Sequence, residues 1–352
     1  MSGPRHCNYA LDALPRCASA ALLAIAWIVS VSVGLAGTAE AGPNGFDVTR
    51  ADIPTQEILR GGPPRDGIPA LDAPLMEIAR NARWPDDTMV VGVALPGEDG
   101  VLLARAYPIP ILAWHELVND RIGDRPILVS YCPLCASAMI FDRSGSGESP
   151  DRFGVSGLLY QSDLLMFDRR SESLWTQIGA RAVTGPRAGE RLPLIRSTQE
   201  RWSTWRRRHP DGLVLSRKTG HRRDYDRSPY AGYAESKQLY FPVSAADKKL
   251  RRFHPKTRTL GLRTAAGNEA RAYPLPTLVA ANGSITGTFA GHPVTVSFDD
   301  ERSSFEVQAP AEIQFVDTYW FAWITFHPHS AVAAREAGDR AAKRERERDE
   351  SD

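Results

Sequence analysis

The sequence predicts a β-rich α+β fold built from two related, internally duplicated mixed subdomains with short helices and antiparallel hairpins. Three observations lead to this prediction. Short apolar, β-prone runs alternate with turn-forming stretches, as at residues 89–106. Helical patterns are few and short, as at residues 111–119. Several motifs also occur twice in the same order along the chain, which is typical of a duplicated unit.

The clearest repeated motif is RAYPIPIL at residues 105–112, which shares six of eight residues with RAYPLPTL at 271–278. Strand-like apolar runs precede and follow both copies. A further echo is the pattern Trp-x-x-Trp-x-x-x-His-Pro, which occurs at residues 202–210 and again at 320–328. Because these matches keep their order, we expect two copies of one structural unit.

The repeats and the composition of the remaining stretches predict the organisation of the whole chain. The predicted parts are a signal peptide at 1–41, an extended N-terminal segment at 42–88, a first repeat at 89–216, a linker at 217–254, a second, shorter repeat at 255–333, and a charged, disordered tail at 334–352.

The N-terminal segment has the pattern of an export signal. Positive charge at Arg5 and Arg16 flanks an uncharged apolar stretch at 18–36, and Ala39-Glu40-Ala41 fits a small-x-small cleavage site. We therefore expect a periplasmic or secreted protein. The alternative is a retained inner-membrane anchor, because roughly nineteen uncharged residues approach the length that spans a bilayer.

Charge and cysteine content narrow the functional classes. The chain has 43 Lys and Arg against 42 Asp and Glu, so we expect neither nucleic acid nor an anionic membrane surface as a partner. No motif indicates a nucleotide or organic cofactor. Cleavage of the signal would remove Cys7 and Cys17 and leave only Cys132 and Cys135, which cannot staple distant parts of the fold. Stability must then come from burial of apolar side chains.

Cys132-Pro133-Leu134-Cys135 lies between two β-prone runs, at 127–131 and 136–142, and is predicted to form the tip of a hairpin. Two thiolates on a hairpin tip have the shape of a metal knuckle. One knuckle supplies two of the four ligands that a zinc site needs. Sulfur combined with imidazole suits Zn or Cu about equally, so we predict a mononuclear site for one of these metals.

His115 is the expected third ligand. When the repeats are aligned, His115 corresponds to Ala281, while Cys132 and Cys135 correspond to Asp299 and Arg302. The candidate ligands are thus replaced in the second copy, whereas turn and strand residues persist. This difference favours a site in the first copy alone.

Neighbours of His115 are expected to support the site. Glu116 and Asp120 are placed to orient the imidazole as hydrogen-bond acceptors. Asn119 follows His115 by four residues and shares its face in the predicted helix. The remaining possible contributors are Asp163, which is also typical of a turn, and His209 and His327, which are also typical of helix C-termini.

Two other functions remain open from the residues alone. The first is thiol–disulfide exchange, although the residues after Cys135 resemble a strand rather than the helix that usually lowers a thiol pKa. The second is a non-catalytic binding module braced by a Cys132–Cys135 disulfide. The sequence does not decide whether the protein is an enzyme.

A series of motifs in order resembles one uncharacterised bacterial family, domain of unknown function 3179, over about residues 61–332. The motifs are WHELVND at 114–120, CPLC at 132–135, FGVSGLLY at 153–160, DLLMFDR at 163–169, SLW at 173–175 and FHP at 326–328. The resemblance implies no established activity. One departure is Ala136, where the family usually has Gly, which adopts a left-handed backbone more readily than Ala.

Overall fold

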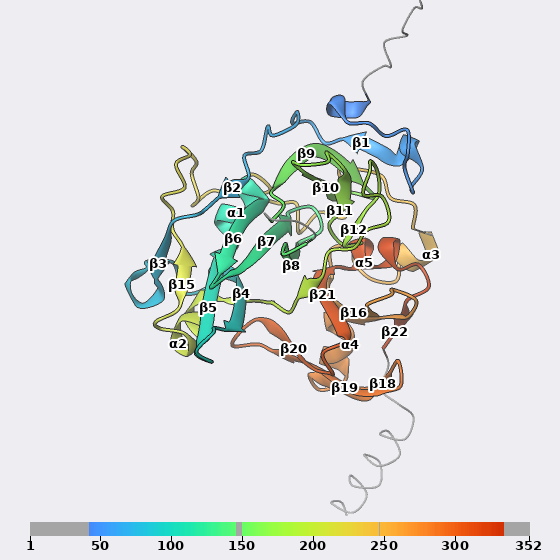
Figure 1. The fold of residues 1–352 in the computed structure, drawn as a ribbon. Helices are drawn as coiled ribbons and strands as arrows, with labels where there is room; N and C mark the ends of the chain where they lie inside the picture. Colours follow the sequence, from blue (N-terminus) through green and yellow to red (C-terminus); the bar gives the residue numbers. More distant parts are fainter. Residues whose placement is uncertain (1–41, 146–149, 246, 334–352) are drawn as a thin grey trace, which may run out of the picture. The chain divides into compact units, whose positions relative to one another are not determined.

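The computed structural model describes residues 42–145, 150–245 and 247–333 (Figure 1). Within these ranges strands predominate and helices are few and short, which confirms the β-rich character predicted from the sequence. None of these helices has the length and hydropathy required to cross a bilayer. The predicted signal peptide at 1–41 and the charged tail at 334–352 lie outside the described residues.

Three of the sheets in this part of the chain have five strands each. The first has the order β1 (Ile58–Arg60), β9 (Phe153–Tyr160), β10 (Asp163–Asp168), β11 (Leu174–Thr176), β12 (Arg181–Ala182). The second has the order β13 (Leu194–Ile195), β8 (Ser137–Asp142), β7 (Arg125–Cys132), β6 (Leu117–Ile122), β2 (Leu71–Asp72). The third has the order β14 (Thr198–Arg201), β4 (Met89–Pro96), β5 (Leu102–Pro108), β15 (Leu213–Leu215), β3 (Met76–Ile78).

Two smaller sheets and short helices complete the described structure. The fourth sheet has the order β21 (Ile313–Tyr319), β16 (Arg258–Thr264), β17 (Ala270–Pro274), β22 (Ala331–Val332), and the fifth has β18 (Ser284–Phe289), β19 (His292–Asp299), β20 (Ser304–Gln308). The α-helices are α1 (Ile109–His115), α2 (Trp202–Arg208), α3 (Asp247–Leu250), α4 (Leu275–Ala280) and α5 (Trp320–Phe326). Single 3₁₀ turns lie at Pro43–Gly45, Thr55–Glu57 and Ala79–Asn81.

Two hairpins lie where the sequence predicted them, and a third is formed by β9 and β10. Strands β4 and β5 pair around a turn in which Gly100 has a φ of 77°, a left-handed conformation that glycine adopts without strain. Strands β7 and β8 pair around the cysteines, and β9 and β10 pair around Gln161 and Ser162. The predicted helix at 111–119 is shorter than expected, because α1 ends at His115 and Asn119 lies in β6.

The strands around the two repeated motifs pair in the same way. We call the strands within residues 89–216 the first set and those within 255–333 the second set. Strand β14 is antiparallel to β4 and β15 is parallel to β5, while β21 is antiparallel to β16 and β22 is parallel to β17. Leu213 faces Arg105 in the first set, and Ala331 faces Arg271 in the second. Both arginines begin the repeated RAYP motif, so the two motifs occupy matching positions in their sheets.

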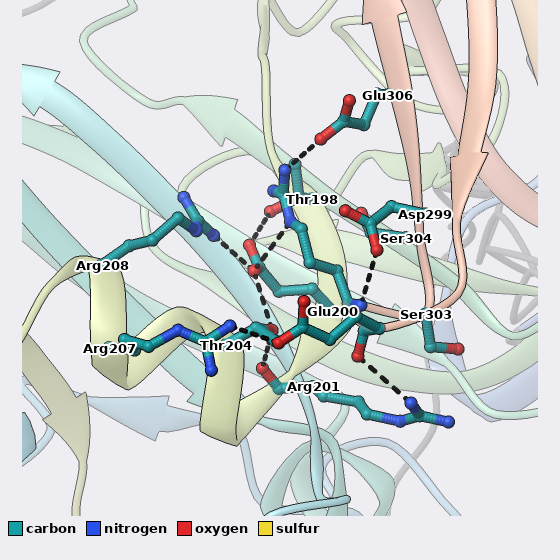
Figure 2. A network of polar contacts seen from close by, with 12 residues as sticks. Thr198, Glu200, Arg201, Thr204, Arg207, Arg208, Asp299, Ser303, Ser304 and Glu306 are labelled. Atoms are coloured by element: carbon teal, nitrogen blue, oxygen red, sulfur yellow. Dashed lines mark hydrogen bonds and ion pairs between the residues drawn. The ribbon is translucent and has the colours of Figure 1, made fainter.

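The two sets also contact each other through matching hairpin turns. The Tyr319 amide, just before α5, donates to the Cys135 carbonyl in the β7–β8 turn (2.8 Å). Conversely, the Arg201 amide, just before α2, donates to the Arg302 carbonyl in the β19–β20 turn (2.8 Å). Figure 2 shows the side-chain network around this second contact, in which Glu200 pairs with Arg208 of α2. Glu200 also pairs with Arg302 of the β19–β20 turn. Each turn is therefore anchored on the other set.

One buried cluster joins side chains from both sets, including Cys132 and Met139 from the first and Val316, Trp320 and Trp323 from the second. All described residues also fall within one compact unit. Each repeat also has a buried cluster of its own, so the shared cluster joins two parts that keep separate cores. The segments at 89–216 and 255–333 meet where an apolar hairpin face of the first set is covered by α5 and β21 of the second.

The repeated tryptophans pack against glycines in the facing strands. A Cβ added at Gly92 would lie 2.7 Å from the indole of Trp205, and one added at Gly261 would collide with the ring of Trp323. Both indoles are almost fully buried. The strand glycines and the Trp-x-x-Trp pattern therefore recur together because each large ring needs a position without a side chain.

We expect Gly261→Ala to lower the free energy of unfolding by about 1–3 kcal/mol, because an added methyl group overpacks a filled core. Denaturant unfolding of the two proteins measures this difference. Gly145→Ala is the matched control, since its Cβ would meet no atom closer than 3.8 Å. Equal stability of both variants would show that Trp323 moves aside without cost.

Candidate functional site

The predicted hairpin carries both cysteines, but its tip is buried rather than exposed. Cys132 ends β7 and pairs with Ser137 at the start of β8, and the Cys135 amide donates to the Cys132 carbonyl (3.2 Å). Both thiols are free, and both side chains are buried. Ala136 has a φ of 47°, so the residue in the usual Gly position adopts the left-handed conformation that Gly favours.

A third polar group reaches the cysteines from the β9–β10 hairpin. The ligand atoms of Cys132, Cys135 and Asp163 all lie within 4.8 Å of one another, and we call these three residues the Cys–Asp cluster. The Cys135 Sγ atom is 3.4 Å from the Ser162 carbonyl. Gln161 and Ser162 both have positive φ values, of 55° and 64°. This strained two-residue turn places Asp163 beside the sulfurs.

A buried hydrogen-bond network fixes the hairpin against the segment that follows β11. Gln177 accepts from the Ser137 hydroxyl (2.5 Å) and donates to Ser130 Oγ (3.0 Å). The next amide, that of Ile178, donates to Asp163 Oδ2 (3.0 Å). The hairpin that carries the sulfurs and the Asp163 carboxylate are thus both hydrogen-bonded to the same short stretch of chain.

Several polar atoms around the Cys–Asp cluster have no hydrogen-bond partner. They are Asp163 Oδ1, the Ser162 hydroxyl and the Tyr233 hydroxyl, and all three are buried. Burial raises the pKa of Asp163 to about 7 and also raises the pKa of both thiols. A buried polar group without a partner costs roughly 1–3 kcal/mol. These three buried atoms are therefore available to accept or donate further hydrogen bonds beside the two thiols.

A cavity of about 230 Å³ adjoins Cys132. Glu116 and Tyr230 are among its polar lining, whereas most of its wall is apolar. Burial and the nearby Asp163 raise the pKa of Glu116 to about 8. Glu116 has a φ of 58°, and its amide donates to the Leu112 carbonyl at the end of α1. The cavity lining in full is Gly61, Pro63, Ile68, Glu116, Cys132, Pro133, Leu134, Val155, Gly157, Leu158, Leu159, Leu164, Tyr230, Tyr240 and Phe241.

One wall of this cavity comes from the segment at 217–254, which the sequence suggested as a linker. Tyr230, Tyr240 and Phe241 line the cavity, and Tyr233 is buried against the same cluster of side chains as Cys132. The segment contains little regular structure. It nevertheless covers the cysteines and separates them from solvent.

His115 is not a member of the Cys–Asp cluster. Its Nδ1 atom lies 2.8 Å from the Pro69 carbonyl and its Nε2 atom 2.7 Å from the Tyr225 hydroxyl. Burial lowers the pKa of His115 to about 4, which keeps the ring neutral near pH 7. Both ring nitrogens are therefore engaged, and the group capable of holding a metal contains Asp163 where the sequence suggested His115.

The predicted supporting residues divide into two groups. Glu116 lies beside the cluster, but Asp120 accepts from Arg105 (2.6 Å) and Tyr107 (2.7 Å), and Asn119 donates to Asp72 (2.8 Å). Neither of these two contacts His115. The two other histidines that were named as possible contributors, His209 and His327, directly follow α2 and α5, as their sequence context indicated.

Sequence reasoning named Asp163 only as a possible contributor and missed Ser162 and Tyr233. One signal for Asp163 was available. Strands β9 and β10 are joined by two residues without the Gly or Asn that such tight turns prefer. Two residues other than Gly or Asn at a tight turn indicate backbone strain and therefore a position of functional interest.

No curated protein and no solved structure matches this chain. One family profile does match, and it spans residues 65–312, which includes every member of the Cys–Asp cluster. The match covers well over half of the chain. The protein therefore belongs to the family described as Protein of unknown function (DUF3179).

Proposed function

We propose that the protein binds one zinc ion through Cys132, Cys135 and Asp163, and that the fourth coordination position faces the cavity lined by Glu116. The observation that supports this most directly is Asp163 Oδ1, a buried carboxylate oxygen without a hydrogen-bond partner next to two free thiols. Zinc accepts sulfur and carboxylate ligands at about 2.0–2.3 Å. The three ligand atoms already lie within 4.8 Å of one another, close enough to share one ion.

Charge balance favours a cation at this position. Two thiolates and one carboxylate would carry three negative charges, and no Lys or Arg is among the residues that line the cavity. Without a cation, the raised pKa values keep both thiols protonated near pH 7 and leave the Asp163 carboxyl group only partly ionised. A divalent ion lowers these pKa values and stabilises the ionised ligands.

The ligand set favours zinc over copper. Thiolates alone suit Cu(I) and Zn²⁺ equally, but a carboxylate is a harder ligand that suits Zn²⁺ better. Three protein ligands and an open fourth position are typical of zinc sites that bind a water or a small molecule. The mostly apolar cavity would accept a small molecule whose donor atom reaches the metal, in a protein that the N-terminal pattern suggests is exported.

We also propose that the two strand sets are copies of one unit and that the metal site is specialised in the first. Cys132 pairs with Ser137 at the end of β7, and Asp299 pairs with Ser304 at the end of β19. Arg302 then occupies the position of Cys135. In the second turn Arg302 pairs with Glu200 (Figure 2). The position that carries a proposed metal ligand in the first turn therefore carries an ion-paired arginine in the second.

Elemental analysis and free-thiol titration of protein purified without chelator test the metal proposal. We expect about one equivalent of zinc, which is lost in Cys132→Ser and in Asp163→Asn. His115→Gln is the matched control and should retain the metal, because its ring contacts Pro69 and Tyr225 instead of the cluster.

Two outcomes would contradict the proposal. Two titratable thiols with no metal would exclude the zinc site. Absence of both metal and free thiols would indicate a Cys132–Cys135 disulfide instead. The reduction potential of that bond would then distinguish a structural brace from a redox-active pair.

A further inference from the structure

A second cavity of about 230 Å³ contains three arginines and is separate from the cavity next to Cys132. Arg181, Arg191 and Arg263 line it, together with polar groups that include Gln161 and His327. We call it the arginine cavity. Among its lining residues in the described part of the chain there is no Asp or Glu. Its lining therefore carries positive charge without a matching acidic side chain.

Arg263 supplies the strongest indication of a missing ligand. It lies in β16, and only 3% of its surface is exposed. Its Nε atom donates to Gln314 Oε1 (3.0 Å) and one terminal nitrogen donates to the Ile178 carbonyl (2.5 Å), but both acceptors are neutral. Burial, followed by the charge of Arg191, lowers the pKa of Arg263 to about 10. Charged side chains are rarely buried unless they are paired.

The other lining groups leave the positive charge largely unbalanced. Arg191 is exposed, and its guanidinium group donates to the neutral Ala266 carbonyl (3.3 Å). Arg181 forms an ion pair with Asp52 (3.4 Å), which is itself half exposed. In addition, His327 Nε2 is buried and has no hydrogen-bond partner. Asp52 pairs with Arg181, and the Glu57 carboxylate bonds to Gln161 in the lining. The hydrogen bonds of Arg191 and Arg263 described here go to neutral acceptors, and the free His327 Nε2 lies beside them.

We propose that the arginine cavity binds a phosphoryl group, either as inorganic phosphate or as the phosphate of a small ester. Arg263 would contact it from within, while Arg181 and Arg191 would contact it from the solvent side. Guanidinium groups match the oxygens of phosphate with paired, charge-assisted hydrogen bonds. The cavity is large enough for the anion together with a small organic substituent.

The arginine cavity is linked to the Cys–Asp cluster through one residue. The Ile178 amide donates to Asp163, while the Ile178 carbonyl accepts from Arg263. Gln161, which lines the arginine cavity, also precedes Ser162 and Asp163 in the strained turn. The phosphate proposal does not depend on the metal, and phosphate binding should survive in Cys132→Ser.

Isothermal titration calorimetry with inorganic phosphate, and separately with glycerol phosphate, tests the proposal at constant ionic strength. We expect saturable binding of one equivalent, and no binding heat with chloride. Arg191→Gln should raise the dissociation constant about tenfold, the effect of losing one charge-assisted hydrogen bond. Arg222→Gln is the control, because it removes the same charge from an exposed residue that does not line the cavity.

A comparison of the affinities for inorganic phosphate and glycerol phosphate tests the size of the ligand. Tighter binding of glycerol phosphate identifies an ester as the ligand class, and equal or weaker binding identifies the free anion. Arg263→Met should abolish binding, and if this variant does not fold, Arg181→Gln provides the second test from the solvent side. Unchanged phosphate affinity in both Arg181→Gln and Arg191→Gln, or equal effects of chloride and phosphate, would overturn the proposal.

Discussion

Addition of a zinc chelator is expected to lower the free energy of unfolding of the protein by about 4 kcal/mol, if zinc was first present at about 1,000 times its dissociation constant. The reason is linkage, because an ion at the proposed site binds the folded Cys–Asp cluster much more tightly than the unfolded chain. Removal of zinc also leaves Asp163 Oδ1 buried without a partner. Urea unfolding with and without chelator measures the change as a shift in midpoint.

Asp163→Asn separates loss of the metal from a general effect of the chelator. An amide is a poor zinc ligand, so the unfolding midpoint of this variant should not respond to chelator. His115→Gln should respond as the wild type does, because the imidazole bonds to Pro69 and Tyr225. A wild-type protein whose stability is unaffected by chelator would contradict a zinc site in the folded protein.

Replacement of Glu200 by Ala is expected to lower the free energy of unfolding by about 2–3 kcal/mol. Glu200 has no exposed surface in its side chain, and it pairs with Arg208 and with Arg302 (Figure 2). Loss of one partner from a buried ion pair costs roughly 3–5 kcal/mol when the remaining charge stays buried. Here the cost is smaller, because the side chain of Arg208 is 40% exposed and that of Arg302 is 20% exposed.

Two further variants test whether the loss of stability comes from removal of the buried negative charge. Glu200→Gln keeps the shape of the side chain and should recover only part of the lost stability. Glu301→Gln is the matched control from the same network, since Glu301 and Arg207 are both largely exposed and such pairs contribute less than about 1 kcal/mol. Chemical denaturation of the three variants gives the comparison. Similar stabilities for Glu200→Gln and Glu301→Gln would show that the buried charge contributes little.

The hairpins could be predicted from the sequence because each depends on residues close together in the chain. The β7–β8 turn follows from Cys132-Pro133-Leu134-Cys135 between two apolar runs, and the β4–β5 turn from a stretch that ends at Gly100. The extent of α1 could not be predicted. It ends at His115 because Glu116 has a positive φ. Glutamate rarely adopts such a conformation, so its presence in the sequence does not predict the end of a helix.

Asp163, the third member of the Cys–Asp cluster, could not be identified from local sequence patterns. Asp163 reaches the sulfurs because Gln177 ties the β7–β8 hairpin to the chain segment whose next amide, Ile178, bonds to the carboxylate. These contacts join residues far apart in sequence. His115, by contrast, is close to the cysteines in sequence and is chemically suitable as a ligand. Its ring instead bonds to Tyr225, which lies in a segment without a periodic pattern that would predict its position.

The anchoring of the cysteine turn on α5 has a consequence for the timing of folding. The Cys135 carbonyl accepts from Thr318 Oγ1, a residue 183 positions later in the chain, as well as from the Tyr319 amide. Contacts between such distant residues close late, because the entropy of a long loop must first be overcome. The sulfurs therefore acquire their final surroundings only after the last described helix has emerged and docked. Until then, the turn that carries both thiols lacks the contacts that α5 and Thr318 give it in the folded protein.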